Sequence, residues 1–259
     1  MAEQILHSKI YEKQGTIPLL IFHGLFGMLD NWATLGRKFA ENNEIHLIDL
    51  RNHGRSFHSD EMSYASMSED IVNYMNHYHL PKAVLLGHSL GGKAVMECAV
   101  KYPKLIEKLI VVDISPRAYP PHHQAIIKAL ESVDFSLVKE RKDVQNALSQ
   151  YINEQSIVQF LMKNLYRKED NSFSFRFNLK TLTEKYNQLI NKPISFGKYE
   201  GKTLFISGEK SNYILKEDEF YIKQQFPDEQ LITLPHAGHW VQADNPEKFY
   251  EVVYSFLKS

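Results

Sequence analysis

The sequence predicts an α/β fold: a mostly parallel central sheet flanked by helices, with an inserted helical cap. Short apolar runs alternate with longer helical stretches, which is typical of parallel strands joined by helices. The apolar runs lack strict alternation, as expected of strands buried on both faces. The alternation stops between Arg117 and Ile190, where helical stretches follow one another. A chain of 259 residues suits one core with an inserted subdomain.

The elements are expected in the following order. An N-terminal hairpin around residues 5–13 should add antiparallel edge strands. Buried strands are predicted at 18–24, 44–50, 83–87, 108–114, 203–208 and 230–234. Helices are predicted at 29–42, 66–78, 91–102 and 217–225 in the core, and at 121–132, 137–148, 154–164 and 179–189 in the cap.

Prolines bound the inserted segment. Pro120 and Pro121 stand at its entry, and Pro193 stands at its exit. We therefore expect residues 1–116 and 191–259 to form the core, and 117–190 to form the cap, inserted after the sixth strand.

Composition excludes several classes of function. Thirty Lys and Arg against 31 Asp and Glu leave a net charge of −1, so no strong field favours nucleic acid or an anionic membrane. The single cysteine, Cys98, permits no internal disulfide and lies among apolar residues typical of a packed helix. No apolar run has the length of a signal peptide or a bilayer span, so we expect a cytoplasmic protein with a small-molecule partner. Its oligomeric state is left open.

Residues 84–92 carry the clearest chemical motif. They read as a strand, a G-x-S-x-G turn around Ser89, and the start of a helix. Such a turn pushes the serine hydroxyl out at the carboxyl end of the sheet, and the small residues let the backbones pass closely. Ser89 is therefore the expected nucleophile.

An oxyanion hole needs two backbone N–H groups aimed at the developing alkoxide. One is expected from Leu90, which follows the nucleophile. The other is expected from the loop after the first buried strand, from Leu25 or, as a weaker candidate, Phe26. His23 in that loop is read as a structural hydrogen-bonding residue.

Two histidines compete for the general base in the loop after the last strand, His236 and His239. The G-H-W context and the helix start at Asn245 favour His239. The pairs His77/His79 and His122/His123 are interpreted as solvated surface residues, because no carboxylate cluster at ligand spacing accompanies them. No metal and no cofactor are expected, since no phosphate-binding glycine loop is present either.

The whole chain resembles the α/β-hydrolase superfamily, and more narrowly the YbfF-type esterases and their mitochondrial relatives. The segments that carry the resemblance are HGLFG at 23–27, RNHGRS at 51–56, GHSLGGKA at 87–94, VDISP at 112–116, FRFNL at 175–179 and GHWV at 238–241. The resemblance implies hydrolysis of carboxylic esters, with acyl-thioesters also plausible, beneath a helical cap. It gives the RNHGRS segment a loop-shaping role, so Arg51 and His53 are not assigned to catalysis.

The sequence departs from the superfamily pattern at the triad acid. Ser211 occupies the usual acid position after the strand at 203–208. Asp113 is the preferred acid, because it stands at the carboxyl end of the neighbouring strand, and Glu209 is its main rival. The order Ser89, Asp113, His239 is that of α/β-hydrolases.

Two other functions stay open at this stage. The same triad serves carbon–carbon bond hydrolases and a menaquinone-pathway lyase, whose substrates carry carboxylates. A cationic pocket under the cap would distinguish these, and Arg117 and Arg176 are weak candidates for it. The second alternative is a non-catalytic binding protein, since a fold alone does not prove a function.

Overall fold

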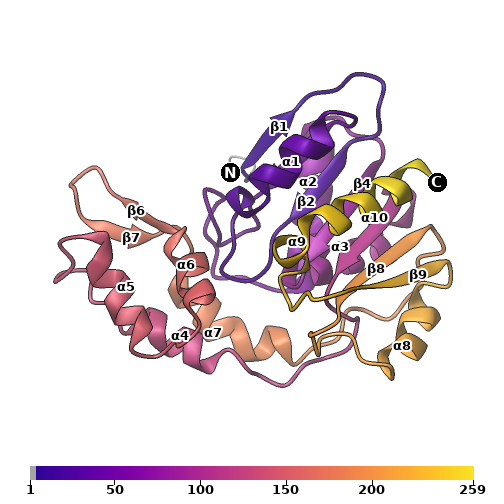
Figure 1. Ribbon diagram of the computed structural model, residues 1–259. Helices are drawn as coiled ribbons and strands as arrows, with labels where there is room; N and C mark the ends of the chain where they lie inside the picture. Colours follow the sequence, from indigo (N-terminus) through magenta and orange to yellow (C-terminus); the bar gives the residue numbers. More distant parts are fainter. Residues whose placement is uncertain (1–3) are drawn as a thin grey trace.

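A computed structural model describes residues 4–259 of the chain, and its centre is a seven-stranded sheet (Figure 1). The strand order is β1-β3-β2-β4-β5-β8-β9, and every neighbouring pair is parallel except β1 with β3. The α/β class and the mostly parallel sheet predicted from the sequence are confirmed. The strands are β1 (Ser8–Tyr11), β2 (Leu19–Phe22), β3 (Ile45–Ile48), β4 (Ala83–His88), β5 (Ile106–Val112), β8 (Thr203–Gly208) and β9 (Glu229–Leu234).

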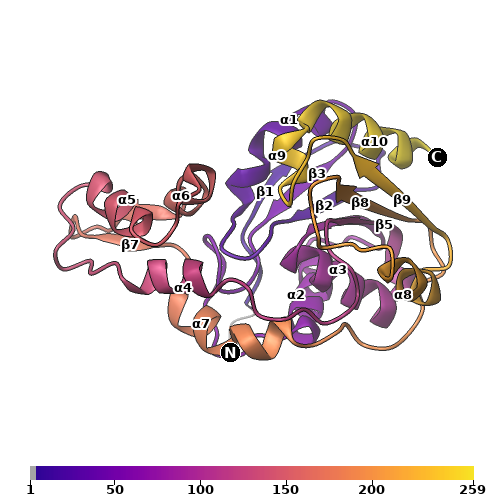
Figure 2. The same cartoon turned by 60° about the horizontal axis from the view of Figure 1, so that its bottom comes forward.

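Helices cover both faces of the sheet, and this explains the continuous apolar character of the strands. In β2, Leu20 and Phe22 belong to one buried cluster, while Leu19 and Ile21 belong to the other. Figure 2 shows α2, α3 and α8 on one side, and α1, α9 and α10 on the other. These helices are α1 (Ala33–Ala40), α2 (Tyr64–His77), α3 (Leu90–Lys101), α8 (Asp218–Gln225), α9 (Val241–Asp244) and α10 (Pro246–Lys258).

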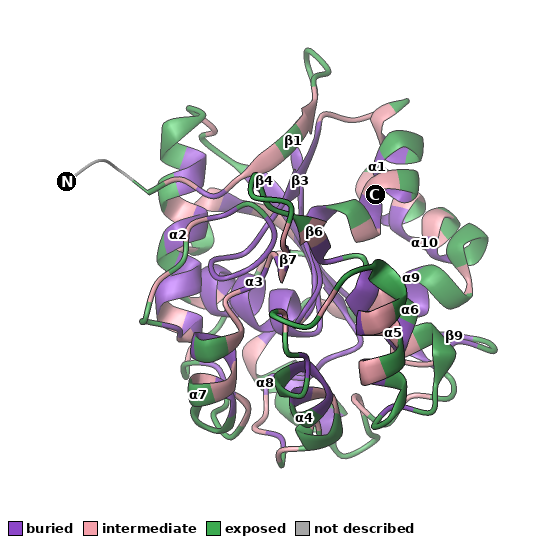
Figure 3. Cartoon of the chain, turned by 90° about the vertical axis from the view of Figure 1, so that its left-hand side faces the viewer, coloured by how far each residue is buried: buried purple, intermediate pink, exposed green. Residues whose placement is uncertain are grey.

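The strands at the centre of the sheet are buried along their whole length (Figure 3). Cys98 of α3 is also fully buried, as expected for a core residue. A short 3₁₀ helix, Leu29–Trp32, precedes α1, and another, Pro103–Leu105, leads into β5.

The segment between β5 and β8 stands beside the core as a separate lobe, seen at the left of Figure 1. It contains α4 (Gln124–Glu131), α5 (Arg141–Ser149), α6 (Gln155–Met162) and α7 (Leu179–Ile190). A small antiparallel hairpin, β6 (Leu165–Arg167) with β7 (Phe173–Phe175), was not expected there. The hairpin forms because Phe173 and Phe175 are buried on one face of β7 while Asn171, at a φ of 67°, turns the chain.

Two expectations about strand count are wrong. The N-terminal segment forms a single strand, β1, whose antiparallel partner is β3 rather than a neighbouring hairpin strand. The chain turns at Gly15, which has a φ of +76°, and then enters β2 directly. The cap therefore follows the fifth strand in chain order, not the sixth. The division into residues 1–116 and 191–259 against 117–190 stays a prediction.

Candidate active site

Ser89 lies on a strained turn between β4 and α3. Its φ of 52° and ψ of −115° lie outside the regions that most side chains adopt. A Cβ atom at Gly87 would approach the carbonyl oxygen of Gly91 to 2.3 Å, and one at Gly91 would approach that of His23 to 2.6 Å. Only glycine fits at both positions, which is the physical reason for the G-x-S-x-G spacing.

His239 and Asp113 are hydrogen-bonded to each other at the carboxyl edge of the sheet. The His239 Nδ1–H donates to Asp113 Oδ2 at 2.7 Å. Asp113 follows β5 directly, has a φ of 50° and is fully buried. Its carboxylate also accepts the N–H of Gly208 at 3.1 Å and the hydroxyl of Ser211. These three donors compensate for the loss of solvation of the buried charge.

Burial shapes the ionisation of this pair. It raises the pKa of Asp113 to about 6, although the hydrogen bonds from Ser211 and Gly208 favour the charged carboxylate. Burial lowers the pKa of His239. At neutral pH the pair therefore rests as a carboxylate and a neutral imidazole, the state that a general base requires.

Glu209, the rival acid, lies elsewhere. Its Oε2 accepts the backbone N–H of His236 at 2.7 Å, and its side chain is 54% exposed. The His236 side chain is 86% exposed. Ser211, at the usual acid position, instead donates to Asp113. The structure thus brings Asp113 and His239 together and leaves Glu209 and His236 on the surface.

The loop after β2 presents Leu25 rather than Phe26 to the serine. The Phe26 N–H already donates to His53 Nε2 at 3.2 Å. The N–H of Leu25 has no protein partner within residues 4–259, and that of Leu90 opens α3, where no intrahelical acceptor exists. Leu25 and Leu90 both line a cavity with Ser89. Leu25 is therefore the better placed of the two candidate donors.

Two buried histidines, His23 and His53, hold this loop. His53 donates from Nδ1 to the Arg51 carbonyl at 2.9 Å while Nε2 accepts from Phe26. His23 accepts the N–H of Leu50 at Nε2 (3.1 Å) and donates from Nδ1 to the Gly24 carbonyl (2.8 Å). Burial lowers the pKa of His23 to about 4 and that of His53 to about 3, so both rings are neutral. Their roles are structural.

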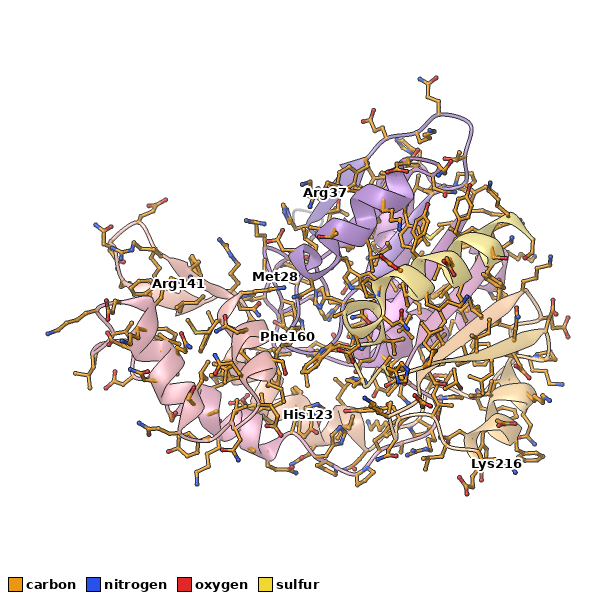
Figure 4. The ribbon with its side chains drawn as sticks, viewed as in Figure 1. Met28, Arg37, His123, Arg141, Phe160 and Lys216 are labelled. Atoms are coloured by element: carbon orange, nitrogen blue, oxygen red, sulfur yellow. The ribbon has the colours of Figure 1, made fainter. Side chains whose placement is uncertain are left out.

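The cap covers Ser89 and is hydrogen-bonded to the loop after β2, called the oxyanion loop below. Asn164, which follows α6, donates from Nδ2 to the Phe26 carbonyl at 2.7 Å. A small, partly open cavity of about 40 Å³ has both Ser89 and His239 in its wall. Figure 4 shows the side chains of Phe160 and His123 between the cap and the core. The cap residues that line this cavity are His123, Ile126, Ile157, Phe160 and Leu161.

The interpretation of His123 as a solvated surface residue is wrong. Its Nδ1 accepts the Tyr186 hydroxyl at 2.8 Å, and burial lowers its pKa to about 3. The side chain lines the wall beside Ser89. Its neighbour His122 is exposed as expected, yet it is hydrogen-bonded to the Tyr213 hydroxyl. A run of two histidines carries no signal that would separate these environments.

Tyr213 and His88 also contact His239, and the sequence did not point to either. The Tyr213 ring stacks on the His239 imidazole with centroids 3.8 Å apart and planes 16° from parallel. His88 donates from Nε2 to the His239 carbonyl at 2.8 Å. These contacts fix the imidazole from the ring face and from the backbone.

Neither arginine considered for a cationic pocket lies beside Ser89. Arg117 pairs with Asp218 at 2.7 Å and borders an open cleft whose wall also contains Tyr213 and His239 but not Ser89. The Arg176 guanidinium packs over the Tyr166 ring in the cap. Among the described residues, no cluster of three or more His, Cys, Asp or Glu side chains could hold a metal ion. Within residues 4–259 no helix has both the length and the apolar character needed to cross a bilayer.

Comparisons with known proteins identify the family. The family model described as the alpha/beta hydrolase fold matches residues 17–246. The esterase YbfF of Escherichia coli is 32% identical over 93% of this chain and 92% of its own length. The sn-1-specific diacylglycerol lipase ABHD11 of Mus musculus is 36% identical, covering 97% of this chain and 85% of that protein. A solved marine microorganism esterase is 37% identical with a TM-score of 0.94, covering 98% of this chain and all of that one. The chain belongs to the α/β-hydrolase family.

Proposed function

We propose that this chain hydrolyses carboxylic esters, and acyl-CoA thioesters by the same chemistry, through an acyl-enzyme on Ser89. Its similarity to named esterases and to a lipase makes it a carboxylic ester hydrolase. The observation that carries the mechanism is the 2.7 Å hydrogen bond from His239 Nδ1 to the buried Asp113 carboxylate, with His239 and Ser89 in the wall of one cavity.

The reaction proceeds in two halves. His239 Nε2 takes the hydroxyl proton of Ser89 as Oγ bonds to the acyl carbon, and Asp113 stabilises the imidazolium that forms. The imidazolium then protonates the leaving alkoxide or thiolate as its bond to the acyl carbon breaks. In the second half, His239 deprotonates a water molecule that attacks the acyl carbon, and the imidazolium returns that proton to Ser89 Oγ as the bond between Oγ and the acyl carbon breaks.

The N–H groups of Leu25 and Leu90 form the oxyanion hole of this proposal. Leu25 and Leu90 line the cavity of Ser89 from two separate elements, so a carbonyl oxygen bound between their N–H groups would receive two hydrogen bonds. His53 supports the assignment to Leu25 because it occupies the N–H of Phe26. The apolar cap residues around Ser89 exclude water from the acyl group.

A fluorophosphonate probe and a substrate panel test the proposal together. Ser89 should be labelled in the wild-type protein and not in Ser89→Ala. Simple acyl esters and acyl-CoA thioesters should both be hydrolysed, with an acyl-enzyme detectable by mass spectrometry. Labelling without ester hydrolysis would favour the carbon–carbon hydrolase or lyase reading. Absence of labelling would favour a binding protein.

A further inference from the structure

Lys93 is a buried cation that the mechanism above does not use. It lies one helical turn after Ser89 in α3, and its N–H donates to the Ser89 carbonyl at 3.0 Å. The residue is 1% exposed. Ser89 and Lys93 line one cavity, so the Lys93 side chain lies on the side of α3 that faces the nucleophile.

The Lys93 ammonium has fewer partners than it has protons. It donates one hydrogen bond, to the Arg117 carbonyl. The rings of Tyr64 and Tyr119 lie 5.5 and 5.1 Å from Nζ, within cation–π range. Within residues 4–259 no second oxygen acceptor lies within hydrogen-bond distance of Nζ. Burying an ammonium with a single acceptor is unfavourable, and an oxygen from outside the chain would remedy it.

A cavity connects this lysine to the nucleophile. It holds about 30 Å³, enough for two or three water-sized groups, and its wall includes Ser89, Leu90 and Lys93. The hydroxyl-bearing residues Tyr64 and Tyr186 line it as well. The aliphatic side chains Leu25, Ile114, Leu189 and Ile190 and the rings of His123 and Tyr213 complete the wall. The cavity is small, and beyond the serine Lys93 supplies its amine.

We infer that this cavity receives an acyl group whose far end carries a carboxylate held by Lys93, so that the preferred substrates are monoesters of short dicarboxylic acids. The inference rests on the proposed function, because it places the acyl carbon on Ser89. The carboxylate accepts hydrogen bonds from Nζ of Lys93, and the scissile carbonyl lies against Leu25 and Leu90. The small volume limits the acid to a spacer of one or two carbons.

The charge of Lys93 depends on what occupies the cavity. Burial lowers the pKa of Lys93 well below its ordinary value, and the nearby Arg117 adds to the effect. A carboxylate bound beside the amine would act in the opposite direction and stabilise the ammonium form. The Arg117 charge itself is paired with Asp218, so the amine that faces the cavity is that of Lys93.

Two pairs of isosteric esters test the inference in the wild-type protein. Monomethyl malonate is compared with methyl isovalerate, and monomethyl succinate with methyl isocaproate. In each pair a carboxylate replaces an isopropyl group of the same shape, and hydrolysis is followed by alkali uptake at constant pH. The kcat/KM should favour at least one acid member by about tenfold or more, as expected of a charge-assisted hydrogen bond. Preference for the neutral member in both pairs overturns the inference.

Lys93→Met separates recognition from packing, because methionine keeps the length and removes the charge. The ratio of acid to neutral kcat/KM should fall about tenfold or more. The matched control is Lys101→Met on the same helix, where the lysine pairs with Glu97, and its ratio should equal that of the wild type. An unchanged ratio in Lys93→Met means that the lysine only connects α3 to residue 117 through its hydrogen bond, and overturns the inference.

Fluorophosphonate labelling distinguishes a failure of this inference from a failure of the proposed function. A labelled Ser89 with no acid preference refutes the inference alone, whereas an unlabelled Ser89 refutes the proposed function and the inference with it.

Discussion

The Ser211 hydroxyl donates a hydrogen bond to Oδ2 of Asp113, the same oxygen that accepts from His239. Ser211 stands after β8, where the superfamily usually places the triad acid, whereas Asp113, the acid we propose, follows the neighbouring strand β5. The proposed acid and the residue at the usual acid position thus lie side by side. The carboxylate that accepts the hydrogen bond from His239 therefore still lies at the carboxyl edge of the sheet.

Asp113→Asn should retain the fold and lose about four orders of magnitude in kcat, because an amide does not hold the imidazole in the required tautomer. Steady-state hydrolysis of a short acyl ester measures the loss, and circular dichroism checks the fold. Glu209→Gln is the matched control and should stay within about twofold of the wild type, since Glu209 bonds only to the exposed His236. A dead Glu209→Gln with an active Asp113→Asn would move the acid to β8.

The pH dependence of kcat/KM should report the ionisation of the Asp113 carboxyl group. Because burial raises the pKa of Asp113 to about 6, kcat/KM should decline as the pH falls through that value and the carboxylate takes up a proton. The titration belongs to the hydrogen-bonded pair of Asp113 and His239 rather than to one residue. A profile that stays flat down to pH 4.5, about 1.5 units below that pKa, would contradict this ionisation scheme.

Ser211→Ala should shift the same acid limb to higher pH. The serine donates to the charged form of Asp113, so its removal raises the pKa of the carboxyl group further. The expected displacement is about half a unit to one unit, with a smaller loss of kcat at pH 8 than at pH 6. An acid limb moved to lower pH, or left in place, would show that the hydroxyl does not stabilise the carboxylate.

Asn164→Ala should lower kcat by about tenfold with little change in KM. The side-chain amide of Asn164 donates a hydrogen bond from the cap to the Phe26 carbonyl, and this bond orients the loop that carries Leu25. His58→Ala is the control, because His58 also bridges core and cap, at the Arg176 carbonyl, but away from that loop. Equal losses in the two variants would indicate general loosening of the cap rather than an effect on the oxyanion loop.

Phe160→Ala should shift the preference among neutral alkanoyl esters toward longer or bulkier ones. Phe160 of α6 lines the Ser89 cavity and packs on Trp240 with ring centroids 5.3 Å apart, so its truncation widens the space between cap and core. A series of alkanoyl esters measures kcat/KM against chain length. Leu137→Ala, on an exposed part of the cap, should leave the preference unchanged. If Phe160→Ala gives the wild-type profile, the cap does not select the acyl group.

Much of this fold could be predicted because its main signals are local. The strands β2 to β5, β8 and β9 lie where apolar runs predicted them, since both faces of the sheet are covered. The geometry around Ser89 follows from glycines whose spacing is visible in the chain. The two-stranded hairpin of the cap was missed because a three-residue strand has too few positions to show a period.

At the site, the sequence pattern did not reveal the contacts between segments that lie far apart in the chain. His123 is half-buried, with its ring hydrogen-bonded to Tyr186 of α7, and the Tyr213 ring stacks on His239. The burial of Lys93 could not be predicted either, because a lysine in a helix is ordinarily expected to be exposed. Each depends on tertiary packing between segments far apart in sequence.

The most direct measurement is intact-mass analysis of the wild-type protein and of Ser89→Ala after brief exposure to an activated acyl ester. The mechanism predicts an acyl adduct on the wild type that maps to the peptide containing Ser89 and decays with turnover, together with a fall of several orders of magnitude in kcat for Ser89→Ala. Undiminished hydrolysis by Ser89→Ala, or an adduct confined to another residue, would contradict the account.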